Sequence, residues 1–196
     1  MAEAGRMTAP RLKTDAQFLL PAGSFAWEGE LARMFDFVSE NQLLKPELWT
    51  LFVDQFRASP DDADRGWRSE YWGKLMRGGC FVYACTQAPA LYASLEAAVA
   101  DLLTTQDALG RITTYSPEAS FQGWDLWGRK YVLLGLQYFL EICRDEALGE
   151  AIVAAMCRHA DDVLLHIGPV EEGKLEINEA TSHWHGLNSS SILEPM

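Results

Sequence analysis

Tryptophan and tyrosine side chains recur at helical spacing in the middle of this chain. Trp124, Trp127, Tyr131 and Tyr138 are separated by three, four and seven residues, which places them on one stripe of a helix. The negative π-face of an indole suits a sugar ring, whose axial C–H groups carry partial positive charge. We therefore expect Trp124 and Trp127 to contact a carbohydrate, whereas core packing is the favoured interpretation of the two tyrosines. Trp72, followed by Gly-Lys as Trp127 is by Gly-Arg, is expected to point into the same region.

Carboxylates accompany these tryptophans. Asp125 falls in the first turn of the predicted helix, where the helix dipole favours a negative charge, and it is spaced for an i,i+4 ion pair with Arg129. Those are structural roles. The functional alternative is a carboxylate that holds substrate hydroxyl groups, and Glu70 is a weaker candidate for the same role.

A second polar group precedes the end of the chain. His183 and His185 flank a tryptophan, and Asn188 and Ser189 follow shortly after. A His-x-His pair can ligate a metal, but no acidic or thiol ligands cluster nearby, so hydrogen bonding to a polyol is the preferred hypothesis. The alternative is helix capping by Asn188 and the serines, with exposed histidines.

The sequence contains no complete catalytic constellation. It has no GxSxG motif, no P-loop and no dinucleotide glycine fingerprint, and His159 and His166 are expected on a helix surface. The cysteines show no CxxC spacing, so they are interpreted as small buried thiols in a reducing cytoplasm, not as a zinc site. They are Cys80, Cys85, Cys143 and Cys157.

The elements that position these residues are predicted to be helices. Apolar residues recur at spacings of three and four, and the resulting helices cover 28–40, 46–56, 69–86, 91–103, 123–143 and 147–166, with another opening near Ser191. The third and fourth form an antiparallel hairpin, as do the fifth and sixth. Long connectors follow each hairpin, and 111–115 and 174–177 within them are expected to form short strands.

A block of the chain recurs after 63 residues. Gly110-Arg111-Ile112 is echoed by Gly173-Lys174-Leu175, and Gly123-Trp124-Asp125 by Gly186-Leu187-Asn188. Repetition at this period indicates one structural unit copied and stacked. Helical hairpins with their long connectors on one side predict an all-α toroid or solenoid in which the helix starts meet at one end.

Composition narrows the possible partners. A chain of 196 residues with 48% apolar residues and seven tryptophans predicts a packed globule. The net charge of −12 disfavours nucleic acid and anionic membrane, because both require a cationic surface, and a neutral substrate fits best. No stretch has the length and apolarity of a signal peptide or a membrane span, so a cytoplasmic location is expected, and the oligomeric state is left open.

The last residues predict the start of a helix. Ser191 to Glu194 fits a capping box, yet the chain stops two residues later, and one turn of helix does not hold itself together. We therefore expect residues 1–26 to be an irregular segment and residues 27–196 to be the N-terminal portion of a longer domain.

Three motifs resemble a known family. Trp67–Lys74 (WRSEYWGK), Gly123–Tyr131 (GWDLWGRKY) and Asn188–Met196 (NSSSILEPM) are similar, in the same order, to segments of the β-L-arabinofuranosidase-like glycoside hydrolases, glycoside hydrolase family 127 and its relatives. The resemblance extends from about Leu19 to the end of the chain.

This resemblance implies a fold and an activity. The family fold is an (α/α)6 barrel of six helical hairpins, of which this chain would supply about the first half. The implied catalytic groups, a cysteine nucleophile in a zinc cluster and a glutamate acid/base, lie beyond Met196, so this chain is expected to bind no cofactor and to be inactive alone. The arabinofuranosidases proper carry sugar-contacting histidines in the segments matching Trp124–Arg129 and Asn188–Ser191, which leaves the sugar open.

Two functions are carried forward. The first is hydrolysis of a terminal glycosidic bond by the full-length protein, with Trp72, Trp124, Asp125, Trp127, His183, His185, Asn188 and Ser189 lining its sugar pocket. The alternative is a non-catalytic array of helical hairpins that binds a glycan or a protein partner.

Overall fold

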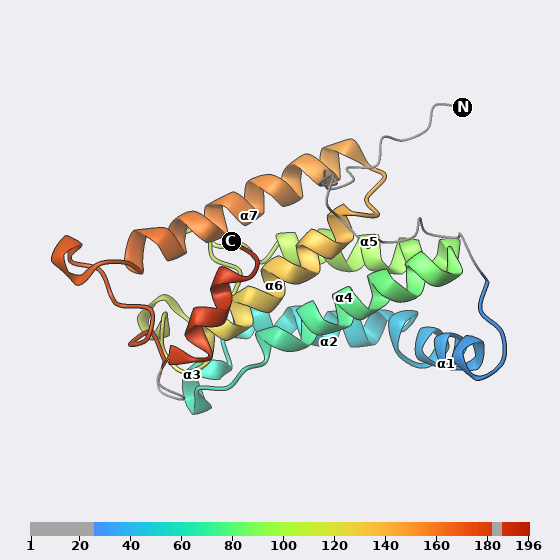
Figure 1. Ribbon diagram of the computed structural model, residues 1–196, viewed down its shortest axis with the longest axis horizontal. Helices are drawn as coiled ribbons and strands as arrows, with labels where there is room; N and C mark the ends of the chain where they lie inside the picture. Colours follow the sequence, from blue (N-terminus) through green and yellow to red (C-terminus); the bar gives the residue numbers. More distant parts are fainter. Residues whose placement is uncertain (1–25, 182–185) are drawn as a thin grey trace, which may run out of the picture.

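The computed structural model describes residues 26–181 and 186–196, and these residues form a helical array (Figure 1). The predicted all-α class is confirmed, and no strand occurs in these two ranges. The α-helices are α1 (Glu30–Val38), α2 (Pro46–Ala58), α3 (Asp61–Asp64), α4 (Ser69–Thr86), α5 (Pro89–Leu103), α6 (Asp125–Leu140) and α7 (Glu146–His166). A π-helical turn at Ser39–Leu43 extends α1, and 3₁₀ turns form at Pro117–Ala119, Val170–Glu172 and Ser189–Leu193.

Local sequence explains where the helices begin and end. Pro46 and Pro89 open α2 and α5, because the first turn needs no amide donor and proline presets φ. Asp145 caps α7, since its side chain accepts a hydrogen bond from the Leu148 amide at 3.1 Å. Gln87 ends α4 in the left-handed conformation, which reverses the chain within two residues and produces the predicted antiparallel hairpin with α5.

The closest helix pair consists of α4 and α6, which are not consecutive in the sequence. Gly73 lies against the backbone of Tyr131, and Gly135 lies against the ring of Trp72, where a Cβ would be 2.9 Å from Cζ3. Gly128 lies against Ser69 near the start of both helices, and Phe81 meets Tyr138 near their ends, so α4 and α6 are parallel. In Figure 1 both run away from the end of the molecule that carries α3. Glycines at the contact allow the two backbones to approach each other closely.

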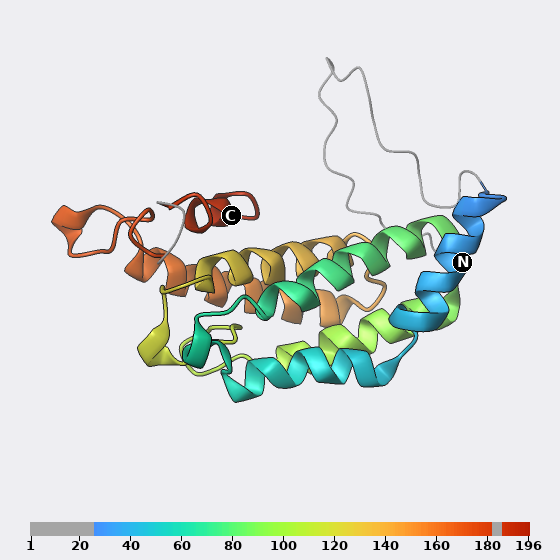
Figure 2. The ribbon, with the colours of Figure 1, turned by 90° about the horizontal axis from the view of Figure 1, so that it is seen from below.

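The last described segment extends this parallel arrangement. Asn188 Nδ2 donates a hydrogen bond to the Gly123 carbonyl at 3.3 Å, and Gln137 Nε2 donates one to the Pro195 carbonyl at 2.6 Å. The 3₁₀ turn Ser189–Leu193 therefore lies along α6 in the same direction as α6 lies along α4. The three segments α4, α6 and Ser189–Leu193 begin at one end of the molecule, as the repeat predicts, and Figure 2 shows the connectors gathered there.

Glycines of the sequence repeat share a backbone conformation. Gly110 and Gly173 have φ values of 87° and 76°, and Gly123 and Gly186 have φ values of 53° and 84°. All four lie in the left-handed region, which residues with a Cβ rarely adopt. At Gly123 a Cβ would also approach the Tyr115 hydroxyl to 2.7 Å. The echo in sequence therefore corresponds to a repeated local geometry.

The predicted strands in the connectors are wrong. Between 111 and 115 the backbone binds side chains and not another strand: the Ile112 amide donates to His159 Nδ1 at 2.9 Å, and the Tyr115 amide donates to Thr113 Oγ1 at 3.3 Å. Between 174 and 177 only a single bridge forms, between Ile167 and Leu175. Buried side-chain partners replace the ladder that the β-branched residues indicated.

The predicted capping box at the end of the chain is also wrong. Ser191 Oγ donates to the Asn188 carbonyl at 2.6 Å, and the Glu194 carboxylate pairs with Lys130 Nζ at 2.6 Å. Neither side chain caps a backbone amide of the other residue, because both side chains are bonded elsewhere. Residues 1–25, the larger part of the predicted irregular segment, lie outside the described residues.

The main core lies between α4 and the helices that surround it. Trp49, Trp72, Met76, Leu95 and Phe139 are among its members, and each is at most 4% exposed. A smaller cluster joins α6 and α7 to the last segment. Within the described ranges, no helix combines the length and apolarity that crossing a bilayer requires.

Candidate functional site

Four aromatic rings form a continuous series where α4 and α6 begin, and we call this series the aromatic platform. It consists of Trp67, Trp124, Trp127 and Tyr131. Successive ring centroids are 5.9, 5.7 and 5.2 Å apart, and each pair meets edge to face. Trp67 is 46% exposed and the other three are half-buried. The predicted contribution of Trp124 and Trp127 to an accessible aromatic surface is therefore consistent with the structure.

A fixed carboxylate lies beside the platform. The Trp127 indole Nε1–H donates a hydrogen bond to Glu70 Oε2, and Lys74 Nζ lies 3.3 Å from Glu70 Oε1. Glu70 is only 8% exposed, so its orientation is set by these partners. A carboxylate held in place next to indole rings can accept hydrogen bonds from the hydroxyl groups of a bound sugar.

Two ammonium groups cover the inner rings of the platform. Lys74 Nζ and Lys130 Nζ lie 4.8 and 4.9 Å from the centroid of Tyr131, and Lys130 Nζ lies 5.1 Å from that of Trp127. Lys130 is almost buried and pairs with Glu194, whose pKa it lowers through this hydrogen bond. The platform therefore combines π-faces with charged donors and acceptors.

The predicted role of Trp72 needs correction. Its ring is 0% exposed and packs against Gly135 in the α4–α6 contact, so it belongs to the core and not to an accessible surface. Its indole nitrogen has no hydrogen-bond partner among the described residues. The equivalence with Trp127 fails because Trp72 lies inside the contact with α6, whereas Trp127 is half-buried beside Trp124 and Tyr131.

Asp125 is likewise buried, and it stabilises the connector. It is 0% exposed, and its carboxylate accepts hydrogen bonds from Thr113 Oγ1 at 2.5 Å and from the Phe121 amide at 2.8 Å. Arg129 Nε lies 3.1 Å from Asp125 Oδ1, and Arg129 Nη1 lies 2.5 Å from Asp162 Oδ2 of α7. The predicted i,i+4 ion pair of Asp125 with Arg129 is confirmed.

Asn188 and Ser189 also serve the fold. They are 3% and 1% exposed, Asn188 Oδ1 accepts from the Ser189 amide at 2.9 Å, and Ser189 Oγ donates to the Ile177 carbonyl at 2.5 Å. The capping alternative accounts for Asn188, whereas the Ser189 hydroxyl binds the connector through Ile177. His183 and His185 lie outside the described residues, so their predicted contact with a polyol is untested.

His159 was expected on the surface, and this prediction is wrong. The imidazole is fully buried, its Nδ1 accepts the Ile112 amide proton, and its Nε2 has no partner within the described ranges. Burial lowers the pKa of His159 well below its usual value, and the nearby Arg129 and Arg111 lower it further. The ring is therefore a neutral structural group. His166, by contrast, is half-exposed.

The cysteines are less uniform than the sequence indicated. All four are free thiols, and only Cys80 is buried, which raises its pKa to about 12. Cys85 and Cys143 are half-buried and Cys157 is exposed. No group of three or more His, Cys, Asp or Glu side chains within 26–181 and 186–196 is arranged to hold a metal ion.

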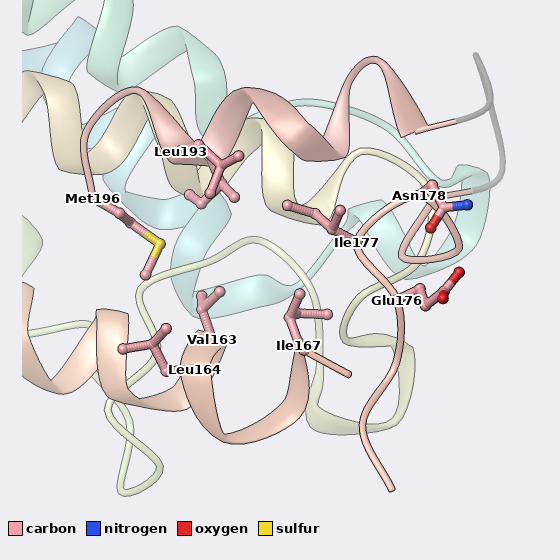
Figure 3. A pocket seen from close by; sticks show the side chains of 10 residues that line it. Val163, Leu164, Ile167, Glu176, Ile177, Asn178, Leu193 and Met196 are labelled. Atoms are coloured by element: carbon pink, nitrogen blue, oxygen red, sulfur yellow. The ribbon is translucent and has the colours of Figure 1, made fainter. Parts of the chain in front are cut away.

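One cavity lies away from the platform. It has a volume of about 490 Å³ and opens between the end of α7 and the last residues of the chain (Figure 3). Its walls are mainly apolar, with Glu176 and Asn178 among the few polar residues, and include Val163, Ile167, Ile192 and Met196. A sugar site needs convergent polar groups, so the chemistry favours the platform over this mainly apolar cavity.

Several platform residues were missed by sequence reasoning. Trp67, Lys74 and Lys130 were not proposed, and Tyr131 was attributed to the core. A signal for α4 was available, since Glu70 and Lys74 share one helix face at i,i+4. No signal showed which face of α4 adjoins α6, because α5 and a long connector separate the two helices in the sequence.

Comparison with known proteins gives no relative for this chain: no family model, no curated protein and no solved structure matches it.

Proposed function

We propose that this chain forms part of the sugar-binding wall of a glycoside hydrolase of the β-L-arabinofuranosidase-like type, built on an (α/α)6 barrel. The observation that carries the proposal is the aromatic platform with Glu70 fixed at its edge. The parallel order of α4, α6 and Ser189–Leu193 supports it, because the inner helices of such a barrel run parallel and begin at one end. The three family-like motifs coincide with the starts of these segments.

The platform is suited to the face of a sugar. Trp67 and Trp124 offer indole surface at the open side, where the C–H groups of a pyranose or furanose ring can stack. Glu70 accepts hydrogen bonds from ring hydroxyls, and Lys74 donates them. Apolar stacking and oriented polar contacts together discriminate one sugar face from the other.

The proposed reaction is hydrolysis of a terminal glycosidic bond. Such hydrolysis uses two catalytic groups that flank the bond, with a charged transition state at the sugar ring. The described residues bind and orient the sugar in this proposal, and in the family that the chain resembles the catalytic groups come from segments that this chain does not contain.

Sugar binding is testable by substitution on the platform. Trp67→Ala removes the most exposed ring and is expected to weaken binding of the best ligand among a panel of methyl glycosides by about fivefold, since stacking contributes about 1 kcal/mol. Titration calorimetry measures the change. Trp27→Ala is the control, because Trp27 packs on Phe35 of α1 and not on the platform. Equal affinity in wild type and Trp67→Ala would contradict the proposal.

The second candidate is a non-catalytic helical array that binds a glycan. The same platform favours it, because sugar binding does not itself require bond cleavage. Aryl glycosides distinguish the two when the protein is expressed from its complete gene. Turnover supports the hydrolase, and saturable binding without turnover across the panel supports the binding module.

A further inference from the structure

One arginine on the same face has no charged partner. Arg77 makes no ion pair and no hydrogen bond within the described ranges. Its guanidinium carbon lies 5.0 Å from the ring centroid of Tyr138 and 5.7 Å from that of Phe81, and the two rings meet at 5.0 Å. Stacking on these rings fixes the plane of the guanidinium and leaves its N–H donors unused.

Arg77 belongs to the same surface as the aromatic platform. Glu70, Lys74, Arg77 and Phe81 are spaced at four, three and four residues along α4, which places them on one helix face. From α6, Tyr138 continues the face that Trp127 and Tyr131 begin. Arg77 therefore lies one helical turn beyond the ammonium group of Lys74, at the far edge of the platform.

The local charge contrasts with the charge of the whole chain. This face holds three cations, Lys74, Arg77 and Lys130, and two carboxylates, Glu70 and Glu194. Each carboxylate is paired with one lysine, which leaves the charge of Arg77 unmatched in a chain of net charge −12. Arg77 also contributes to the lowered pKa of Glu194, after the larger effect of Lys130. An unmatched guanidinium in such a chain is a binding group for an anion.

We propose that the sugar bound on this face carries a carboxylate, as a uronic acid does, and that Arg77 recognises it. This inference rests on the proposed function and names its substrate class. The carboxylate of the sugar accepts hydrogen bonds from the planar fork of Arg77, and its hydroxyl groups bind Lys74, which lies one helical turn away on the same face.

The acidity of the chain limits the ligand to few charges. The negative charges of the chain would repel a polyanion, whereas a ligand with one carboxylate needs only one cation, which Arg77 supplies. The neighbouring carboxylate of Glu194 lies on the same face and repels a bound uronate. Removing that charge with Glu194→Gln is therefore expected to raise the ratio of uronide affinity to neutral-glycoside affinity.

Matched sugars provide the test. Methyl β-D-glucuronide and methyl β-D-glucoside differ at C6, and the corresponding galactose pair covers the other common configuration. Wild-type protein is expected to bind one of the uronides about tenfold more tightly than its neutral partner at low salt, as charge-assisted hydrogen bonds predict. Arg77→Met keeps the apolar stem and is expected to abolish this preference while neutral-sugar binding persists.

The control is Lys45→Met, since Lys45 precedes α2 and is not on this face. Circular dichroism and the melting temperature verify that each variant is folded. A neutral sugar bound as tightly as its uronide, or a preference that survives Arg77→Met, overturns the assignment of Arg77 and leaves the proposed function standing. Failure of every sugar to bind overturns both.

Discussion

At the scale of single residues, the side chains that looked most reactive are the ones that hold the connectors in place. Asp125, Arg129 and Asp162 form a buried ionic chain from the start of α6 to α7, and Arg129 also lies 4.7 Å from the ring centroid of Phe121. Breaking one member would leave the others charged and unpaired in the interior. These residues therefore position the connector that precedes α6.

The neutral state of His159 makes stability depend on pH. The pKa of His159 is lowered in the folded protein, so the unfolded chain takes up its proton first as the pH falls. Neutral His159 makes its full contribution to the free energy of unfolding above the ordinary histidine pKa of about 6.5. Below that pH the free energy of unfolding falls by up to about 1.4 kcal/mol per pH unit. Urea unfolding between pH 7.5 and 5.5 measures this loss, and His159→Gln is expected to reduce it.

Residue roles were only partly predictable from the sequence. The i,i+4 pair of Asp125 and Arg129 was correctly anticipated, because it depends only on helical spacing. The burial of Trp72 was not, since it depends on which face of α4 meets α6. Sequence periodicity locates a stripe but does not say whether a neighbouring helix covers it.

At the scale of helices, the contact between α4 and α6 depends on glycine. A Cβ at Gly73 would collide with the carbonyl group of Tyr131, whereas one at Gly78 on the same helix meets nothing within 4 Å. Gly73→Ala is expected to destabilise the fold by about 3 kcal/mol through overpacking. Gly78→Ala is expected to stabilise it by about 0.5–1 kcal/mol, because alanine restricts the unfolded chain. Denaturant midpoints measure both, and equal effects at the two sites would contradict the close contact.

Helices were the best-predicted elements of this chain, and connectors were the worst. The hairpin α4–α5 was predicted within two residues at each end, because amphipathic spacing, Pro89 and the Gln87 turn all agree. The connector 111–115 reads as a strand from its β-branched residues. Its backbone partners, His159 among them, are distant in sequence and carry no local signal.

At the scale of the whole molecule, buried residues are concentrated in the helices at the middle of the array. Helix α1 has no buried residue, whereas α4 and α6 contain many. Amide exchange is therefore expected to be slowest in α4 and α6 and fastest in α1, since local opening of α1 exposes little apolar surface. Mass spectrometry of deuterium uptake tests this ranking. Strong protection of α1 would show that another surface covers it.

The all-α class and the common end at which α4, α6 and Ser189–Leu193 begin were predictable, because repetition is visible in the sequence. The glycines at 110, 123, 173 and 186 mark the same turns in successive units, and their positive φ values confirm the correspondence. The repeat does not give the tilt between units, because tilt depends on the side chains packed between the helices.

The close approach of α4 and α6 has a consequence for recognition. With backbones in direct contact, the rings and charges that the two helices present form one stiff surface, already arranged before any ligand arrives. A ligand that binds there loses translational and rotational entropy, but the protein side chains lose little conformational entropy. Few contacts therefore suffice for measurable affinity.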